Sequence, residues 1–333
     1  MPYFYLCAVD IFKDVLYTIV VLTQTILQGD ARALLQTIPD NTIRCCVTSP
    51  PYFGLRDYGM SEQIGLEPSL DDYIAELVTV FREVRRVLTP DGTFWLNIGD
   101  SYAGSGRGPE GNLGKDTQSR HVGHKRQSVV PTGMKPKDLI GVPWMLAGAL
   151  RADGWYLRSE IIWAKATSGQ RDYLVHVAQA ARVAGINPSQ VDALIASLNL
   201  PVGTAMPESV RDRPTRAHEQ IFLLSKSRSY YYDNDAINEP ALNGGVRHIR
   251  DVWALNTSSY KGAHFATFPP EFVRMCILAG SQPGDTVLDP FLGAGTTMTV
   301  AKQHGRACIG MELNPEYVEL ARARVAEIDS LVS

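Results

Sequence analysis

The stretch that decides the fold is residues 286–312, TVLDPFLGAGTTMTVAKQHGRACIGME. Its pattern predicts a buried strand at Thr286–Asp289, a glycine-containing loop at Pro290–Thr297 and a helix that runs to about His304. A second strand is expected at Ala307–Met311. A strand, a helix and a further strand at this spacing form a βαβ unit, which implies a parallel sheet.

Outward from this unit, hydrophobic periodicity predicts alternating helices and strands over most of the chain. The clearest helix is Asp71–Leu88, which Ser69 can cap and which Pro90-Asp91-Gly92 stops. The expected fold is therefore α/β, a doubly wound Rossmann-like sheet. The other expected helices are 31–36, 139–152, 270–279 and 314–328, and the other expected strands are 43–48, 93–98, 156–163 and 220–224.

Composition is that of a globular protein. The chain has 333 residues with 45% hydrophobic and 20% charged residues, and its formal net charge is −3. Any phosphate-binding surface must therefore be a local patch. The five cysteines are scattered and lack metal-ligand spacing, which predicts no metal site and indicates a reducing cytoplasm. They are Cys7, Cys45, Cys46, Cys276 and Cys308.

Residues 1–24 form an apolar N-terminal extension to which we assign no role. Asp10, Lys13 and Asp14 interrupt it, so it is too short for a membrane helix, and no basic region precedes it as in a signal peptide. It is expected to be an extra strand or surface segment. Alternatively, the natural start lies near Leu22.

Three segments interrupt the regular pattern. Residues 103–137 are rich in glycine, serine and basic side chains and predict a long mobile basic loop. Residues 167–205 look inserted, with two helical stretches that favour a helical hairpin over a helix-turn-helix. Residues 227–262 are irregular and aromatic-rich. The resulting divisions are 25–166 and 263–333 for the two halves of one domain, with a return to the sheet at 206–226.

The glycine loop and the acid that follows it suggest a nucleoside cofactor. Gly293 and Gly295 allow a tight turn and close approach of a ligand, while Thr296 begins the next helix. Glu312 closes the following strand, where an acid can accept hydrogen bonds from both ribose hydroxyls. Residues 106–111 (GRGPEG) match a dinucleotide motif, but no helix follows them, so we reject that match.

A second group of residues, Thr48-Ser49-Pro50-Pro51-Tyr52, can hold a planar base. The prolines fix the backbone and leave carbonyl acceptors, Ser49 adds another acceptor, and Tyr52 offers a stacking face. Acceptors on the N–H bonds of an aromatic amine favour the pyramidal nitrogen that attacks a methyl group. Pro-Pro alone would equally fit a strand that ends in a loop.

Three motifs together are specific. TSPPY (48–52), DPFLGAGTT (289–297) with Glu312, and HFATFPPEF (264–272) resemble those of the S-adenosylmethionine-dependent, amino-directed DNA methyltransferases. Their order in the chain, with the cofactor loop last, resembles the permuted beta group of that family. The resemblance covers about residues 25–327, and the stretches 97–102, 135–141 and 206–213 add to it.

The resemblance implies S-adenosylmethionine as cofactor and double-stranded DNA, with the target base flipped out, as substrate. It places Glu312 at the cofactor ribose, Asp30 near the adenine and the HFATFP segment near the methionine end. The implied cofactor residues are Asp30, Thr48, His264, Phe265, Thr267, Phe268, Pro269, Asp289, Pro290, Phe291, Gly293, Gly295, Thr296 and Glu312. The implied catalytic residues are Ser49, Pro50, Pro51 and Tyr52.

The DNA side is expected in three places. Phe53 could stack on the flipped base beside Tyr52, and residues 227–262 form the expected target-recognition region. Basic side chains in the loop can contact phosphates. The expected DNA contacts are Phe53, Arg107, Arg120, Lys125, Arg126, Arg247, His248 and Arg250.

We expect transfer of a methyl group to N4 of cytosine, because in the family SPPY more often accompanies cytosine and DPPY adenine. N6-adenine is the alternative, and a catalytically silent DNA-binding module or a methyltransferase for RNA or small molecules are the rivals. Cytosine C5 is disfavoured because no cysteine follows a proline. A restriction endonuclease and a second copy of the chain are possible partners.

Overall fold

In a computed structural model, the described residues are 23–55, 59–104, 130–165, 181–187, 189–191, 210–241, 244–257 and 268–332. Eight strands form one sheet in the order β1-β10-β9-β2-β3-β5-β4-β8. Among these strands only β5 runs antiparallel to both of its neighbours. The strands are β1 (Gln24–Gln28), β2 (Ile43–Thr48), β3 (Leu88–Ile98), β4 (Tyr156–Lys165), β5 (His218–Ser225), β8 (Val252–Leu255), β9 (Thr286–Asp289) and β10 (Ala307–Glu312).

The sheet joins the two ends of the described chain. Cys46 of β2 lies opposite Leu288 of β9, and Gln28 of β1 lies opposite Glu312 of β10. The late βαβ unit is thus inserted between strands that come first in the sequence. This arrangement confirms the predicted Rossmann-like sheet with permuted order.

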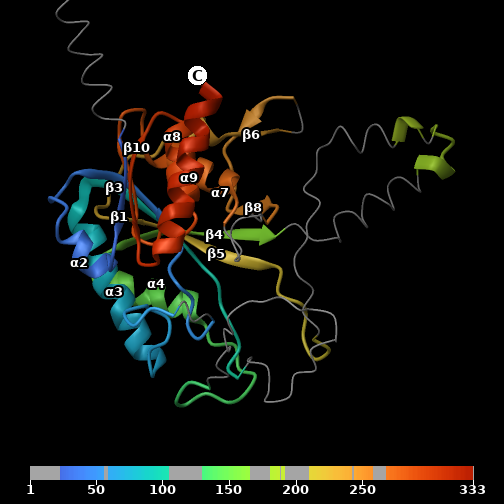
Figure 1. The fold of residues 1–333 in the computed structure, drawn as a ribbon. Helices are drawn as coiled ribbons and strands as arrows, with labels where there is room; N and C mark the ends of the chain where they lie inside the picture. Colours follow the sequence, from blue (N-terminus) through green and yellow to red (C-terminus); the bar gives the residue numbers. More distant parts are fainter. Residues whose placement is uncertain are drawn as a thin grey trace, which may run out of the picture.

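Helices cover both faces of the sheet (Figure 1). Successive β3 side chains alternate between the layers: Phe94 and Leu96 pack in one core, and Trp95 packs in the other. Strands buried on both faces read as the continuous apolar runs seen in the sequence. One layer holds α2 (Ala31–Leu35), α3 (Leu70–Val87) and α4 (Val142–Ala152), and the other holds α7 (Pro270–Gly280), α8 (Thr296–Gln303) and α9 (Pro315–Val332).

The predicted helix at Asp71–Leu88 is confirmed within one residue. Ser69 caps α3 by accepting a hydrogen bond from the backbone N–H of Asp72 at 3.1 Å. Acidic residues occupy its first turn and basic residues its last, as the helix dipole favours. One apolar side of α3 is buried against the sheet.

Two predicted starts were wrong. Strand β3 begins at Leu88 rather than Thr93, because an irregularity in its pairing with β2 accommodates the exposed Pro90 and Asp91. Helix α4 begins at Val142 rather than Leu139. Leu139 instead forms a β-bridge with Tyr102, and the left-handed Gly141 (φ 81°) precedes the helix.

The expected recognition region contains more regular structure than its sequence suggested. Its last strand, β8, extends the main sheet by pairing in parallel with β4. A short 3-10 helix, η1 (Asp235–Ile237), and a small hairpin of β6 (Glu239–Pro240) and β7 (Val246–Arg247) precede it. One part of the predicted irregular segment, β8, is therefore the outermost strand of the main sheet.

Other predictions fall largely outside the described residues. Of the segment 167–205, the structure describes only 181–187 and 189–191, where residues 181–183 and 189–191 are helical. Residues 105–129 of the basic loop are not among the described ones, and the domain limits stay predictions. None of the described helices combines the length and the apolar character that crossing a bilayer requires.

Candidate active site

Asp289, the last residue of β9, is fully buried and joins three elements. Its Oδ1 accepts hydrogen bonds from the hydroxyl of Thr48 at 2.6 Å and from the N–H of Phe291 at 3.1 Å. Its Oδ2 accepts one from the hydroxyl of Thr297 at 2.6 Å. Burial raises the pKa of Asp289 to about 6. Asp289 thus links the glycine loop to the end of β2 and the start of α8.

Glu312, the last residue of β10, holds the other side of the loop. Its Oε2 accepts a hydrogen bond from the N–H of Gly293 and its Oε1 one from the N–H of Asn314, both at 2.8 Å. Burial raises the pKa of Glu312. Glu312 is half-buried, and further lone pairs of its carboxylate can accept hydrogen bonds from a ligand.

The two glycines of the loop have different surroundings. A Cβ on Gly295 (φ 81°) would lie 2.9 Å from the Cβ of Ala321, so this glycine permits close packing of α9. A Cβ on Gly293 (φ 53°) would meet nothing within 4 Å. The close approach predicted at Gly295 is therefore made in part by Ala321 of α9, whereas the space around Gly293 is open in the protein.

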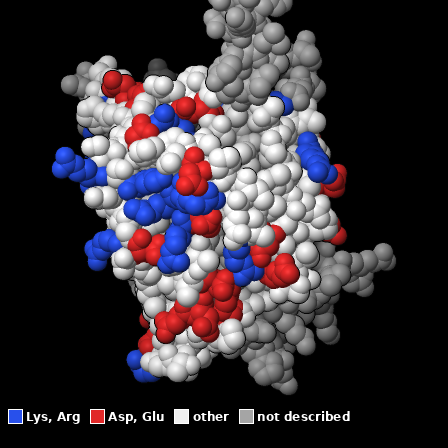
Figure 2. All heavy atoms as spheres, turned by 90° about the vertical axis from the view of Figure 1, so that its left-hand side faces the viewer, with Lys and Arg blue, Asp and Glu red and all other residues white. Residues whose placement is uncertain are grey.

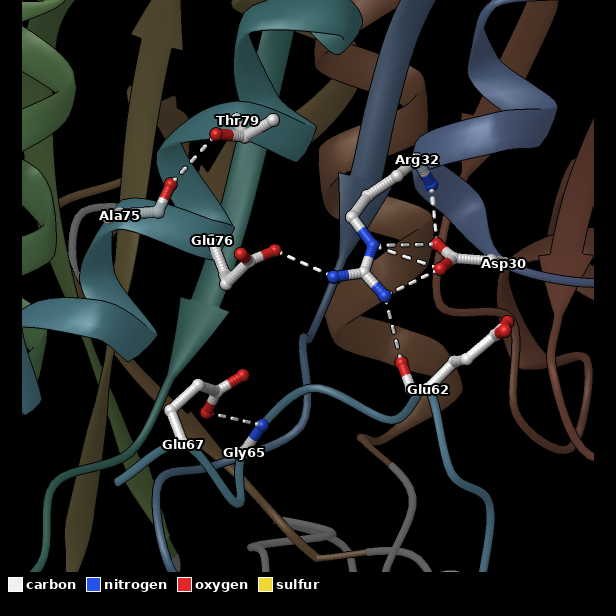
Figure 3. A network of polar contacts seen from close by, with 8 residues as sticks. All are labelled: Asp30, Arg32, Glu62, Gly65, Glu67, Ala75, Glu76 and Thr79. Atoms are coloured by element: carbon white, nitrogen blue, oxygen red, sulfur yellow. Dashed lines mark hydrogen bonds and ion pairs between the residues drawn. The ribbon is translucent and has the colours of Figure 1, made fainter. Parts of the chain in front are cut away.

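Asp30 follows β1 and caps α2 (Figure 3). Its carboxylate accepts hydrogen bonds from the backbone N–H of Arg32 at 2.8 Å and from the Arg32 guanidinium at 2.6 Å. The same guanidinium donates to Glu76 at 2.7 Å and to the carbonyl of Glu62 at 3.0 Å. Arg32 therefore orients Asp30 and offsets part of its charge.

Several of the predicted cofactor residues lie together at one edge of the sheet. Because β1 and β10 are paired, the N–H of Gly29 donates to the carbonyl of Glu312 at 2.9 Å, which brings Asp30 beside Glu312. A side chain added at Gly293, whose N–H donates to Glu312, would meet no protein atom within 4 Å. Two carboxylates and a glycine backbone suit a ligand with ribose hydroxyls and an amine-bearing base, so the residues present fit S-adenosylmethionine.

The remaining predicted cofactor residues have mixed surroundings. Thr296 is buried, and its hydroxyl accepts a hydrogen bond from Arg324 at 3.2 Å. Phe291 is half-buried beside Phe81, and Pro290 is buried. Phe268 packs edge-on against Phe272, and Pro269 precedes α7. The predicted residues His264, Phe265 and Thr267 lie outside the described residues.

The segment Ser49–Tyr52 leaves β2 next to this loop. Ser49 is half-buried, and its Oγ lies 3.5 Å from the Tyr52 hydroxyl. The carbonyl of Pro51 already accepts a hydrogen bond from the Tyr73 hydroxyl at 2.9 Å. This contact occupies one of the two lone pairs of the Pro51 carbonyl oxygen.

Phe53 is a core residue. Only 5% of it is exposed, and its ring packs against that of Tyr73 with centroids 5.3 Å apart. A side chain this buried has no free face for stacking on a flipped base. The prediction that Phe53 contacts DNA is therefore wrong, because the turn at residues 52–55 packs the Phe53 ring into the hydrophobic core with Tyr73.

A cluster around Tyr52 was missed by the sequence analysis. The Tyr52 hydroxyl donates to Oε2 of Glu219 at 2.8 Å, and Lys165 pairs with Oε1 of Glu219 at 2.6 Å. The Nδ2 of Asn97 also donates to Oε2 at 3.1 Å. The only sequence signal for this cluster was polar residues at the ends of three apolar strands.

The predicted DNA contacts gather in part on the β6–β7 hairpin. Glu239 pairs with Arg247 at 2.8 Å and with Arg250 at 3.2 Å, and His248 contacts Asn234. Arg250 is 69% exposed, so it is available to a partner. Arg107, Arg120, Lys125 and Arg126 lie outside the described residues.

On the side of the molecule that carries α3, acidic and basic side chains lie next to one another (Figure 2). Arg86, for example, pairs with both Asp40 and Glu83. Mixed charge of this kind does not make a surface for phosphates.

Comparisons with known proteins indicate the family to which the chain belongs. The family model described as DNA methylase, of the N6/N4 type, matches residues 43–323. The Type II methyltransferase M.Cfr9I of Citrobacter freundii is 47% identical over 92% of this chain and 89% of its own length. M.SmaI of Serratia marcescens is also 47% identical, over 90% of each chain.

Solved structures show the same fold. PvuII DNA methyltransferase (cytosine-N4-specific) has a TM-score of 0.59 at 18% identity, over 91% of this chain and 88% of its own. A putative DNA modification methylase of Thermus thermophilus, solved with S-adenosylmethionine, has a TM-score of 0.56 at 21% identity, over 92% of this chain and 94% of its own.

The chain belongs to the N6/N4 DNA methylase family. It is an S-adenosylmethionine-dependent DNA methyltransferase of the amino-directed class, and both of the relatives named above are Type II methyltransferases.

Proposed function

We propose that this methyltransferase modifies the exocyclic N4 of cytosine in double-stranded DNA. The observation that carries the proposal is the neutral, half-buried Ser49 at the end of β2, directly beside the cofactor loop. The amino group of cytosine is conjugated with its ring and is a weak nucleophile. A neutral acceptor suffices if it is fixed in place, because no proton has to leave before the nitrogen becomes cationic.

Ser49 and the carbonyl of Pro50 are assigned to the amino group. Hydrogen bonds from both N–H bonds to these oxygens favour the pyramidal nitrogen over the planar one, so they stabilise the transition state more than the bound base. S-adenosylmethionine supplies the methyl group as an electrophile. Glu312, Asp30 and the loop at Gly293 are assigned to holding it in line with Ser49.

Access to the base requires that it leave the duplex, at a cost of about a few kcal/mol for unstacking. Tyr52 is assigned to stack on the flipped base, because it is the first aromatic side chain after Ser49. Arg247, His248 and Arg250 are assigned to the recognition surface. A cognate restriction endonuclease is proposed as a functional partner, since the relatives carry the Type II name.

Kinetics of Ser49 variants test this assignment. Ser49→Ala should lower kcat by about tenfold or more and leave KM for DNA nearly unchanged, because it removes an interaction made mainly in the transition state. Label from methyl-tritiated cofactor should appear in unmodified mixed-sequence DNA with the wild-type enzyme. No incorporation would favour a silent DNA-binding module, and an unchanged kcat in the Ser49 variant would reject the role of Ser49.

A further inference from the structure

The ring of Tyr52 is held at two points. Its hydroxyl donates to Oε2 of Glu219 at 2.8 Å. One ring edge lies against Gly99, where an added Cβ would come within 2.6 Å of Cε2 of Tyr52. The hydrogen bond from the hydroxyl orients the side chain. Because Gly99 has no Cβ, there is room for the edge of the ring against its backbone.

Glu219 is itself fixed by two further side chains. Lys165 Nζ lies 2.6 Å from Oε1, and Nδ2 of Asn97 lies 3.1 Å from Oε2. The Glu219 side chain is only 14% exposed and that of Lys165 25%. A carboxylate so far removed from water is costly unless it is paired, and its charged hydrogen bonds are then strong and directional.

These residues come from separate parts of the sheet edge. Tyr52 follows β2, Asn97 lies near the end of β3, Lys165 ends β4 and Glu219 lies near the start of β5. Adjacent strands of a packed sheet move little relative to one another, so the four groups form a rigid support. Burial raises the pKa of Tyr52 and keeps its hydroxyl protonated as a donor.

We propose that Glu219 is a positioning residue, which, fixed by Lys165 and Asn97, sets the orientation of the Tyr52 ring for the target base. The inference rests on the proposed role of Tyr52 as the stacking side chain. Glu219 acts through Tyr52 and does not touch the reacting atoms. A ring already oriented loses less freedom when the base arrives, so the support should act on the chemical step.

A double-mutant cycle tests the proposal on the full chain with methyl-labelled cofactor and unmodified duplex DNA. Tyr52→Phe and Glu219→Ala should each lower kcat by about tenfold, and the double variant should be no more than about twofold worse than either. Glu219→Gln, which keeps one acceptor for Tyr52, should fall between wild type and Glu219→Ala. It also serves if Glu219→Ala does not fold.

Two controls separate positioning from a general loss of structure. The dissociation constant for the cofactor should stay within about twofold of wild type in every variant, since Glu219 lies outside the assigned cofactor residues. Glu160→Gln makes the same substitution on β4, at a position opposite Phe222 of β5 and away from Tyr52, and should leave kcat unchanged.

Three results would overturn the proposal. The first is a kcat about a hundredfold below wild type in the double variant, which would mean that the two effects multiply. The second is a wild-type kcat in the single variants. The third is loss of the acidic limb of the pH–rate profile in Glu219→Gln. The last would mean that Glu219 takes up a proton in the reaction. Methyl transfer to adenine instead of cytosine would reject the proposed target base and leave the cycle readable. A wild-type enzyme that methylates no DNA would overturn both.

Discussion

The hydroxyl of Thr48 donates a 2.6 Å hydrogen bond to Oδ1 of Asp289, across 241 positions of sequence. Thr48 immediately precedes the segment assigned to the base, and Asp289 begins the loop assigned to the cofactor. This bond ties the two half-sites together at the adjacent ends of β2 and β9. The two segments are therefore in direct contact in the fold, although they lie near opposite ends of the permuted sequence.

The stability of the protein should depend on pH through Asp289. Burial raises its pKa from 3.8 to about 6, so the folded state holds a proton that the unfolded state has lost between these values. This proton contributes up to about 3 kcal/mol to the free energy of unfolding. The contribution is fully present below about pH 4 and is lost as the pH rises through about 6.

Urea unfolding of wild type and Asp289→Asn at pH 4.5 and pH 7.5 measures this effect. The asparagine does not titrate, so the variant should lack this part of the pH dependence, and the wild type should lose stability relative to it on going to the higher pH. A difference in unfolding free energy that is the same at both pH values would contradict the role of Asp289.

The two loop glycines should respond differently to alanine. Gly295→Ala forces a Cβ against Ala321 at a left-handed position and should destabilise the fold by about 1–3 kcal/mol. Gly293→Ala, at φ 53°, has the same left-handed strain but meets no protein atom, so it should destabilise the fold less and weaken cofactor binding more. Thermal unfolding and calorimetric titration of both variants distinguish these effects, and the reverse pattern would place the ligand space at Gly295.

Glu312→Ala should weaken cofactor binding by about 10–100-fold, because hydrogen bonds to a charged carboxylate contribute about 1.5–3 kcal/mol. Glu312→Gln keeps the size and one acceptor, so its loss should be smaller. Calorimetry measures the affinity, and an unchanged circular dichroism spectrum is the control for folding. Wild-type affinity in Glu312→Ala would reject this residue as a cofactor ligand.

Arg250→Gln tests the proposed recognition hairpin. If Arg250 contacts a phosphate, the slope of log K for DNA against log salt should fall by up to about 0.9. The matched control is Arg322→Gln on α9, which removes a similarly exposed arginine that is paired within its own helix. Identical slopes and affinities for the two variants would place the DNA contacts elsewhere.

The fold could be predicted where a local pattern determined it. Residues 286–312 gave both strands and the helix between them, and α3 followed from its apolar spacing and the cap at Ser69. Strand β8 escaped prediction because four residues with mixed exposure carry no clear period. Its place is set by pairing with β4, which is a tertiary contact.

The site was predictable only in part for the same reason. Ser49 and Glu312 stand in motifs whose chemistry is visible in the sequence. The contact between Tyr52 and Glu219 joins residues 167 positions apart, and no local pattern indicates it. Phe53 was assigned to DNA because aromatic residues beside a motif suggest stacking, whereas the turn after Tyr52 buries it.

The most direct test of the central claim is mass spectrometry of the nucleosides released from unmodified DNA after incubation with the wild-type protein and S-adenosylmethionine. The geometry around Ser49 predicts N4-methylcytosine, dependent on the cofactor and strongly reduced in Ser49→Ala. N6-methyladenine without N4-methylcytosine would contradict the claim that this neutral acceptor site selects cytosine.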